Sequence, residues 1–274
     1  YGLGGNAYSK KSIQKIFKLK GRPKTNPLII HYYSINNAIE DVVLNKHFKK
    51  LYKKFCPGPI TFILNKKNKT KVKSIDKQNL RTIAIRFPNH RVCRAILKIL
   101  KFPLAMPSAN LSSSVSPVSA ENVADEFQQN LEIIINGGKS KVGIESTVVD
   151  LTGQPKILRP GIISSEILEK FLKIKIDVAK KNSKIKSPGM FKKHYSPGIP
   201  LILNQTKYNK KHAFITFGKI FKNKKNCFNL SKNSDLREAA SKLYATFRRI
   251  KKLKFKKIYV VKIPNKGIGI AIND

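Results

Sequence analysis

The sequence is poor in acidic residues, cysteine and tryptophan. Its 274 residues include 15 Asp and Glu against 56 Lys and Arg, three Cys and no Trp, and its formal net charge is +41. No apolar run approaches the roughly eighteen residues that a membrane-spanning helix needs, and the first residues show no charged-then-apolar signal pattern. We therefore expect a soluble cytoplasmic protein without a membrane span. Cys56, Cys93 and Cys227 lack metal-site spacing and the even number of a disulfide framework, so we expect reduced thiols.

The positive charge has two explanations. Clustered Lys and Arg gain affinity for nucleic acid by releasing phosphate counterions. Here lysine is spread along the whole chain and is accompanied by much Asn and Ile, a composition that A/T-rich codons also produce. Composition alone leaves both explanations open.

Length and hydrophobic content indicate a globular protein. At 274 residues and 41% hydrophobic, the chain can form two domains that each bury a core. The sequence starts at Tyr1 rather than Met and stops at Asp274 within a segment that looks unfinished. We therefore expect a fragment that lacks functional residues at both ends.

Apolar periodicity predicts alternating helices and strands. The expected helices cover residues 9–19, 46–55, 90–100, 120–129, 164–172 and 235–250. The expected strands lie within 27–33, 56–64, 82–88, the start of 103–117, 131–135, 143–151, 156–161, 201–204, 213–218 and 257–263. Asn89 and Ser119 are expected N-caps, and the helix over 90–100 is expected to turn Val92, Ile96, Ile99 and Leu100 to one side.

Residues 20–31, KGRPKTNPLIIH, are typical of an anion-binding loop. Lys20 and Arg22 stand before an apolar strand, which places two cations at the edge of a sheet. In so basic a chain most such pairs are simply solvated. His31 ends an apolar run, where a histidine is more often a structural core residue than a ligand.

Two further segments strengthen the case for a site. Residues 103–117, PLAMPSANLSSSVSP, break from a strand into a loop whose hydroxyls and backbone N–H groups can bind phosphate or carboxylate. Residues 143–161 combine GIESTVVD with ILRPG, which predicts a hairpin that ends at Arg159. Arg86 ends a strand, where it is either a ligand or a surface arginine.

These segments together resemble the YrdC-like threonylcarbamoyl-AMP synthases, in their long two-domain form. The resemblance rests on YGLGGNA, KGRPKTNPLIIH, FCPGPITFIL, TIAIRFPNH, PSANLSSSVSP, INGGKSKVGIESTVVD, ILRPG and SPGMFKKHYSP, which occur in the expected order. It implies an α/β (α+β) fold: a twisted mixed sheet with flanking helices and a smaller Rossmann-like C-terminal α/β domain. We expect the first domain at 1–173, a linker or lid at 174–199 and an incomplete second domain at 200–274.

The resemblance also implies a reaction. L-threonine, bicarbonate or CO2, and ATP with Mg²⁺ would form L-threonylcarbamoyladenylate and pyrophosphate. A separate tRNA threonylcarbamoyl-transferase complex would then use the adenylate to modify tRNAs that read codons starting with A. Weak binding of tRNA or other RNA is compatible with the charge.

The residue roles are implied by matching positions. Lys20 and Arg22 would be catalytic, and His31, Arg86, Met106 (through its backbone) and Ser146 would bind threonine. ATP would contact Arg22, Asn26, Thr82, Ser108, Asn110, Ser116, Arg159 and Tyr195, with no metal ligand among the side chains. The chain departs from the family at Ser113, where glycine is usual, at Val118, where threonine is usual, and at Cys56, where tryptophan is common. A Pro-Thr-Glu-Thr run expected before Tyr1 is missing.

Two alternatives remain at this stage. A non-catalytic module for double-stranded RNA or tRNA would use the basic face alone, although the aromatics are not interleaved with the cations as base stacking requires. RNA binding that persists in a Lys20→Ala/Arg22→Ala double variant, without ATP consumption by the intact protein, would favour this module. A carbamoyl-transferase maturation role would need zinc-finger and acylphosphatase segments, which the sequence lacks.

Overall fold

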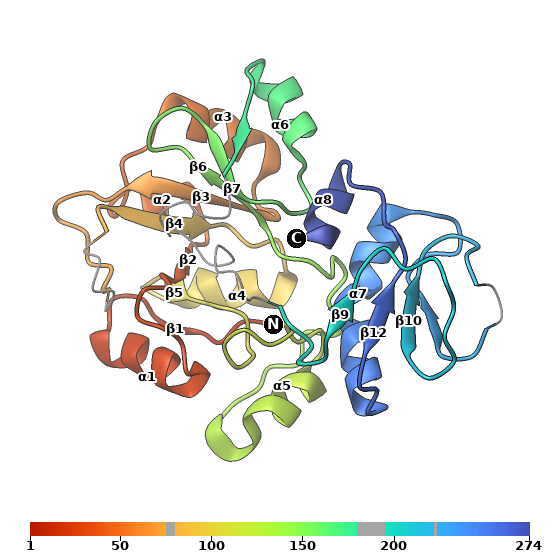
Figure 1. Ribbon diagram of the computed structural model, residues 1–274. Coiled ribbons are helices and arrows are strands. Elements are labelled where there is room, and N and C mark those ends of the chain that lie inside the picture. The colour runs from red at the N-terminus through yellow and green to blue at the C-terminus, as the bar shows by residue number, and fades with distance from the viewer. Residues whose placement is uncertain (75–79, 180–194, 222–223) are drawn as a thin grey trace.

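The computed structural model describes residues 1–74, 80–179, 195–221 and 224–274, and it contains two sheets (Figure 1). The first has eight strands in the order β1-β5-β2-β4-β3-β6-β7-β8 and mixes parallel with antiparallel pairs. Its strands are β1 (Gly5–Asn6), β2 (Ile29–His31), β3 (Ile60–Asn65), β4 (Thr82–Arg86), β5 (Leu104–Ala105), β6 (Thr147–Asp150), β7 (Lys156–Arg159) and β8 (Asp177–Val178). Around it lie α1 (Lys10–Lys20), α2 (Ile35–Ala38), α3 (Lys46–Phe55), α4 (Arg91–Ile99), α5 (Ala120–Phe127) and α6 (Ser165–Leu172), with a 3-10 turn at Gln128–Asn130.

The second sheet has four parallel strands in the order β11-β10-β12-β9. They are β9 (Leu201–Ile202), β10 (Ala213–Thr216), β11 (Cys227–Asn229) and β12 (Ile258–Val260). The helix α7 (Leu236–Lys252) connects β11 to β12, and α8 (Ile268–Asn273) follows β12. Figure 1 shows α7 and α8 on the side of this sheet that faces the first domain. The predicted fold class, a twisted mixed sheet with helices and a smaller α/β domain, is confirmed. None of the described helices is long and apolar enough to cross a membrane.

The domain boundaries stay a prediction. The strand β8 pairs with β7 and so belongs to the first sheet, although the expected linker starts at residue 174. Residues 180–194, which make up most of that linker, lie outside the described residues.

The ends of α1 determine where the first cation lies. Ser9 caps the helix by accepting a hydrogen bond from the backbone N–H of Ser12, and Gly21, at φ 55°, ends it in the left-handed conformation that glycine adopts readily. The side chains of Ile16, Phe17 and Lys20 are buried on one face of the helix. Helical spacing therefore turns the Lys20 ammonium group toward the protein interior.

The central strands of the first sheet separate the main apolar core from a second face, which we call the polar face and on which polar side chains lie beside a small apolar cluster. Successive side chains of a strand point to opposite faces. In β4, Ile83 and Ile85 belong to the main core, whereas Thr82, Ala84 and Arg86 share the other face. The functional side chains are therefore expected on the face opposite the main core.

Three local predictions are wrong. No strand forms at 131–135, where Ile133 is 78% exposed, because an apolar run needs a partner strand and burial to become one. The position before α4 is His90 rather than Asn89, and it makes no side-chain cap. Ile99 ends α4 and is 79% exposed, while Leu97 provides the buried contact.

Asp41 provides a test of the fold. Its side chain is 1% exposed and accepts hydrogen bonds from the hydroxyls of Tyr8, Tyr32 and Thr70 at 2.8, 2.9 and 2.6 Å. We expect Asp41→Ala to lower the free energy of unfolding in urea by about 3 kcal/mol or more, because three hydroxyls lose their acceptor. The control Glu132→Ala removes an exposed ion pair with Lys15 and should cost less than about 1 kcal/mol. Similar losses in the two variants would contradict this account.

Candidate active site

The polar face of the first sheet brings together His31, Arg86 and Thr61. His31 of β2 is the register partner of Arg86 of β4, and Arg86 is the partner of Thr61 of β3. Residues opposite each other on neighbouring strands project to the same face. The hydroxyl of Ser146, just before β6, lies 2.8 Å from that of Thr61. Three of the predicted threonine ligands, His31, Arg86 and Ser146, therefore lie at one end of the sheet.

Met106, the fourth predicted threonine ligand, follows β5 beside this group. Its backbone N–H donates to the carbonyl oxygen of Ile29 at 3.0 Å. A Cβ placed on Gly2 would lie 3.3 Å from that of Met106. Because Gly2 has no Cβ, the N-terminal segment can lie close to Met106.

His31 is neutral in this site. It is 5% exposed, and its Nδ1 lies 3.1 Å from the carbonyl oxygen of Ile29, which can only accept, so Nδ1 carries the proton. Burial, followed by the positive charge of Arg86, lowers the pKa of His31 to about 3, against the opposing effect of the Ile29 and Leu104 carbonyls. A neutral imidazole beside Arg86 adds no further positive charge.

Lys20 organises the segment 107–118, which we call the Ser-Asn loop. The Lys20 side chain is 2% exposed, and its Nζ donates to the carbonyl oxygens of Ser108, at 2.5 Å, and of Asn110. Burial, followed by the charge of Arg22, lowers the pKa of Lys20 to about 7. Asn110 is 4% exposed, and its amide donates to the carbonyl oxygens of Leu111 and Ser114 at 2.7 and 2.9 Å. Lys20 thus joins the helix α1 to two predicted ATP ligands.

Arg22 and Asn26 form one unit. The guanidinium donates through Nε to the backbone oxygen of Asn26 at 2.9 Å and through Nη2 to its side-chain oxygen at 2.7 Å. A further bond, from Nη2 to the carbonyl of Pro27, measures 2.8 Å. Burial lowers the pKa of Arg22 to about 10, with Tyr195 opposing the shift and Arg159 adding to it. The effect of Arg159 indicates that Arg22 lies within electrostatic reach of it.

Arg159 connects the hairpin to the segment after residue 194. It is 3% exposed. The guanidinium donates two hydrogen bonds to the backbone oxygen of Ser146, from Nε at 3.1 Å and from Nη2 at 2.9 Å. A further bond runs from Nη1 to the hydroxyl of Tyr195 at 3.0 Å. Burial acts to lower its pKa, but Tyr195 and Glu145 outweigh this and raise it. The ring of Tyr195 lies 5.7 Å from that of Tyr244 in α7. Tyr195 therefore connects the candidate site with the second domain.

Glu145 belongs to this site, although sequence reasoning left it out. Its carboxylate accepts a hydrogen bond from the hydroxyl of Ser116 at 2.7 Å, and its charge acts to raise the pKa of Lys20, Arg86 and Arg159. The signal available in the sequence was its place as the one acidic residue between positions 133 and 149. Glu145 offsets part of the positive charge.

Two predicted site residues carry buried atoms that suit a ligand. Among the described residues, Nε of Arg86 and Oδ1 of Asn110 are buried without a hydrogen-bond partner. A buried polar group without a partner is costly. A bound anion beside Arg86 and a donor beside Asn110 would remove that cost.

Thr82, a predicted ATP contact, lies away from Arg86. It begins β4, four residues before Arg86, which corresponds to about 13 Å along an extended strand. It lines a small cavity with Ile13, Phe17 and Pro27. Its role in ATP binding stays a prediction.

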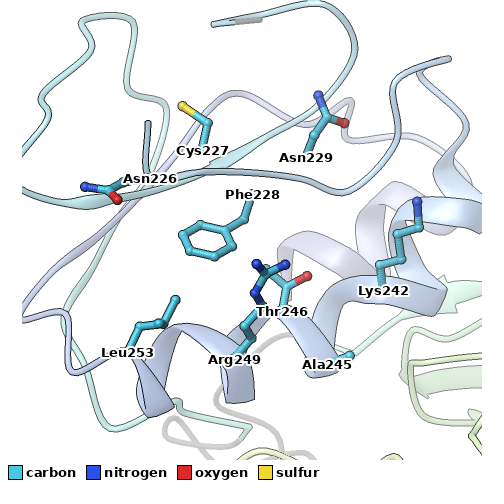
Figure 2. Close-up of a pocket in the computed structure, with 9 residues that line it drawn as sticks. All are labelled: Asn226, Cys227, Phe228, Asn229, Lys242, Ala245, Thr246, Arg249 and Leu253. Carbon is cyan, nitrogen blue, oxygen red and sulfur yellow. The ribbon is translucent and has the colours of Figure 1, made fainter. Parts of the chain in front are cut away.

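A cavity of about 490 Å³ lies outside this site, between β11 and α7 of the second domain. Figure 2 shows Phe228 pointing toward Arg249 across this cavity, with Lys242 at its rim. No motif singled out in the sequence lines it.

The fold and the site define a two-domain α/β protein with a desolvated, cation-rich group of side chains. The Sua5/YciO/YrdC family model, described as "Telomere recombination", matches residues 1–161. A second model, "Threonylcarbamoyl-AMP synthase, C-terminal domain", matches residues 163–274. The chain belongs to the Sua5/YciO/YrdC family, as its motifs predicted.

Known relatives resemble the chain in both sequence and structure. Proteins named threonylcarbamoyl-AMP synthase from Pyrococcus abyssi and Bacillus subtilis are each 39% identical over 209 residues, which cover 74% of this chain. The chain spans 61% and 60% of their respective lengths. The crystal structure of P. abyssi Sua5 complexed with L-threonine matches with a TM-score of 0.90 at 31% identity, over 100% of this chain and 85% of that one.

The buried His31 predicts a pH dependence of stability. Its folded-state pKa is lowered from 6.5 to about 3, so between these values the unfolded chain binds a proton that the folded chain does not. Stability conferred by the neutral imidazole is therefore lost as the pH falls below 6.5, by up to about 1.4 kcal/mol per pH unit. We expect His31→Asn to lose less stability than the wild type between about pH 8 and pH 4.5, measured by urea unfolding. A difference between the two proteins that stays constant with pH would refute this assignment.

Proposed function

We propose that the chain has the activity of a threonylcarbamoyl-AMP synthase. It would join L-threonine, bicarbonate or CO2, and ATP into L-threonylcarbamoyladenylate and release pyrophosphate. The observation that carries the proposal is the group of four desolvated cations, Lys20, Arg22, Arg86 and Arg159, in which the charge of Glu145 acts on Lys20, Arg86 and Arg159. The names of the relatives and the threonine complex of P. abyssi Sua5 support it.

The threonine half of the site is assigned to the polar face of the sheet. The Arg86 guanidinium has an unpaired buried Nε and would bind the amino-acid carboxylate. The hydroxyl of Ser146, already held by Arg159 at 3.0 Å, would add a hydrogen bond. His31 would contact threonine as a neutral group.

The nucleotide half is assigned to the segments around the Ser-Asn loop. ATP would contact Arg22, Asn26, Thr82, Ser108, Asn110, Ser116, Arg159 and Tyr195. Tyr195, which is bonded to Arg159, would cover the nucleotide from the side of the second domain. Lys20 and Arg22 would hold phosphate or carbonate oxygens.

The proposed reaction does not need a nucleophilic side chain. The threonine amine attacks the carbon of bicarbonate, from which water leaves, or adds to CO2 and loses a proton; either route gives a carbamate. A carbamate oxygen then attacks the α-phosphorus, and the bond to pyrophosphate breaks. Such a transfer depends on positioning and on stabilising negative charge. Fixed cations in a dry site provide both.

Mg²⁺ is proposed as the ion that accompanies ATP. Protein sites for Mg²⁺ commonly supply only one or two carboxylates, because phosphate oxygens and water complete the coordination. Glu145 is the carboxylate placed among the cations of this site. The ion would neutralise part of the phosphate charge.

The product suggests the cellular context. We propose that the adenylate passes to a separate tRNA threonylcarbamoyl-transferase complex, which modifies tRNAs that read codons starting with A. We also place the protein in the cytoplasm, where tRNA and free thiols such as those of Cys56 and Cys93 are found.

A direct assay tests the proposed reaction. The protein is incubated with ATP, Mg²⁺, labelled bicarbonate and L-threonine, and both pyrophosphate and the labelled adenylate are measured. We expect pyrophosphate release to require threonine and to match adenylate formation. Release that is independent of threonine, with no adenylate formed, would show that the proposal is wrong.

Arg86→Gln tests the threonine half separately. Loss of a charge-assisted hydrogen bond should raise the KM for threonine roughly 10- to 100-fold while the KM for ATP changes little. The control Arg91→Gln removes an exposed arginine at the start of α4 and should leave both constants unchanged. An unchanged KM for threonine in Arg86→Gln would remove Arg86 from the threonine site.

A further inference from the structure

An arginine of the second domain contacts the Ser-Asn loop. Arg248 lies in α7, and its guanidinium donates to the carbonyl oxygen of Val115 from Nη2 at 2.6 Å and to that of Ser116 from Nε at 3.3 Å. The same Nη2 lies 3.3 Å from Oε2 of Glu126 in α5, and the two side chains are only 16% and 15% exposed. Such a shared, largely dry guanidinium restrains the backbone that it contacts.

Glu126 extends this contact to the other side of the loop. Its Oε1 accepts hydrogen bonds from the backbone N–H of Leu111 at 3.0 Å and from the hydroxyl of Ser114 at 2.9 Å. Burial acts to raise the pKa of Glu126, but these two bonds and Arg248 outweigh it and lower the pKa. The carbonyl oxygen of Ser114 accepts the amide of Asn110 at 2.9 Å. The contacts thus run from Arg248 to a predicted ATP ligand.

The loop needs such restraint. Ser113 has φ 70°, in the left-handed region where a side chain is disfavoured. Val115 is 5% exposed and belongs to the apolar core of the second domain. Lys20 holds the opposite end of the loop through Ser108 and Asn110. The loop is therefore fixed from both domains.

We propose that Arg248 is a positioning residue for ATP: from the second domain it holds the Ser-Asn loop in the conformation that presents Asn110 and Ser116 to the nucleotide. This inference rests on the proposed function, because the two side chains are assigned to ATP there. The threonine ligand Arg86 lies on the sheet and not on the loop. Arg248 should therefore affect ATP binding and leave threonine binding nearly unchanged.

The neighbouring residue provides a matched control. Arg249 follows Arg248 in α7 but is exposed, and its guanidinium lies 5.5 Å from the centre of the Phe228 ring (Figure 2). Three variants are compared with the wild type: Arg248→Gln, Arg248→Lys and Arg249→Gln. The kinetic measurements are the KM for ATP and the KM for threonine. The other measurements are the ATP affinity by calorimetry, the unfolding midpoint, and the hydrogen exchange of the backbone amides at 111–116.

We expect Arg248→Gln to raise the KM and Kd for ATP roughly ten-fold, to change the KM for threonine less than about two-fold, and to speed exchange at 111–116. Arg248→Lys should recover part of the ATP affinity, and Arg249→Gln should match the wild type. Equal increases in both KM values, or wild-type exchange in Arg248→Gln, would overturn the inference. If the wild type forms no adenylate, the proposed function fails, whereas ATP affinity and exchange still decide the role of Arg248.

Discussion

The crowding of buried positive charge is the constraint on which this structure depends. Lys20 and Arg159 are 2% and 3% exposed, and Arg22 and Arg86 lie within electrostatic reach of them. Removing such groups from water costs several kcal/mol each unless partners compensate. Carbonyl oxygens of the Ser-Asn loop and of Ser146 supply some compensation, and Glu145 supplies the negative charge. Anionic substrates would supply the rest.

The fold supports these charges by keeping them off the apolar core. Strand alternation gives β4 one face for the main core and another for Arg86, while the capped end of α1 turns Lys20 inward. The linker and the second domain contribute as well, through Tyr195 on Arg159 and Arg248 on the Ser-Asn loop. We therefore regard the second domain as part of the site rather than as an appendage.

The sequence predicted most of what periodicity and motif order encode. The helix over 46–55, the cap at Ser119 and the hairpin that ends at Arg159 are confirmed. The strand expected at 131–135 failed because strand formation depends on a partner that local sequence does not specify. The sequence did not show the contacts that Glu145 and Arg248 make, because these contacts join segments 29 and 132 positions apart. Motif matching also could not show that Thr82 lies at the far end of β4.

The most direct test of a desolvated cationic site is proton uptake on ATP binding. Burial lowers the pKa of Lys20 to about 7, and a phosphate anion nearby would favour its charged form and raise that pKa. Titration calorimetry at about pH 8.5, in buffers of different ionisation enthalpy, measures the protons taken up per ATP bound. We expect an uptake that approaches one proton, is much smaller at about pH 6, and disappears in Lys20→Met. ATP binding at pH 8.5 with no proton uptake would contradict this expectation.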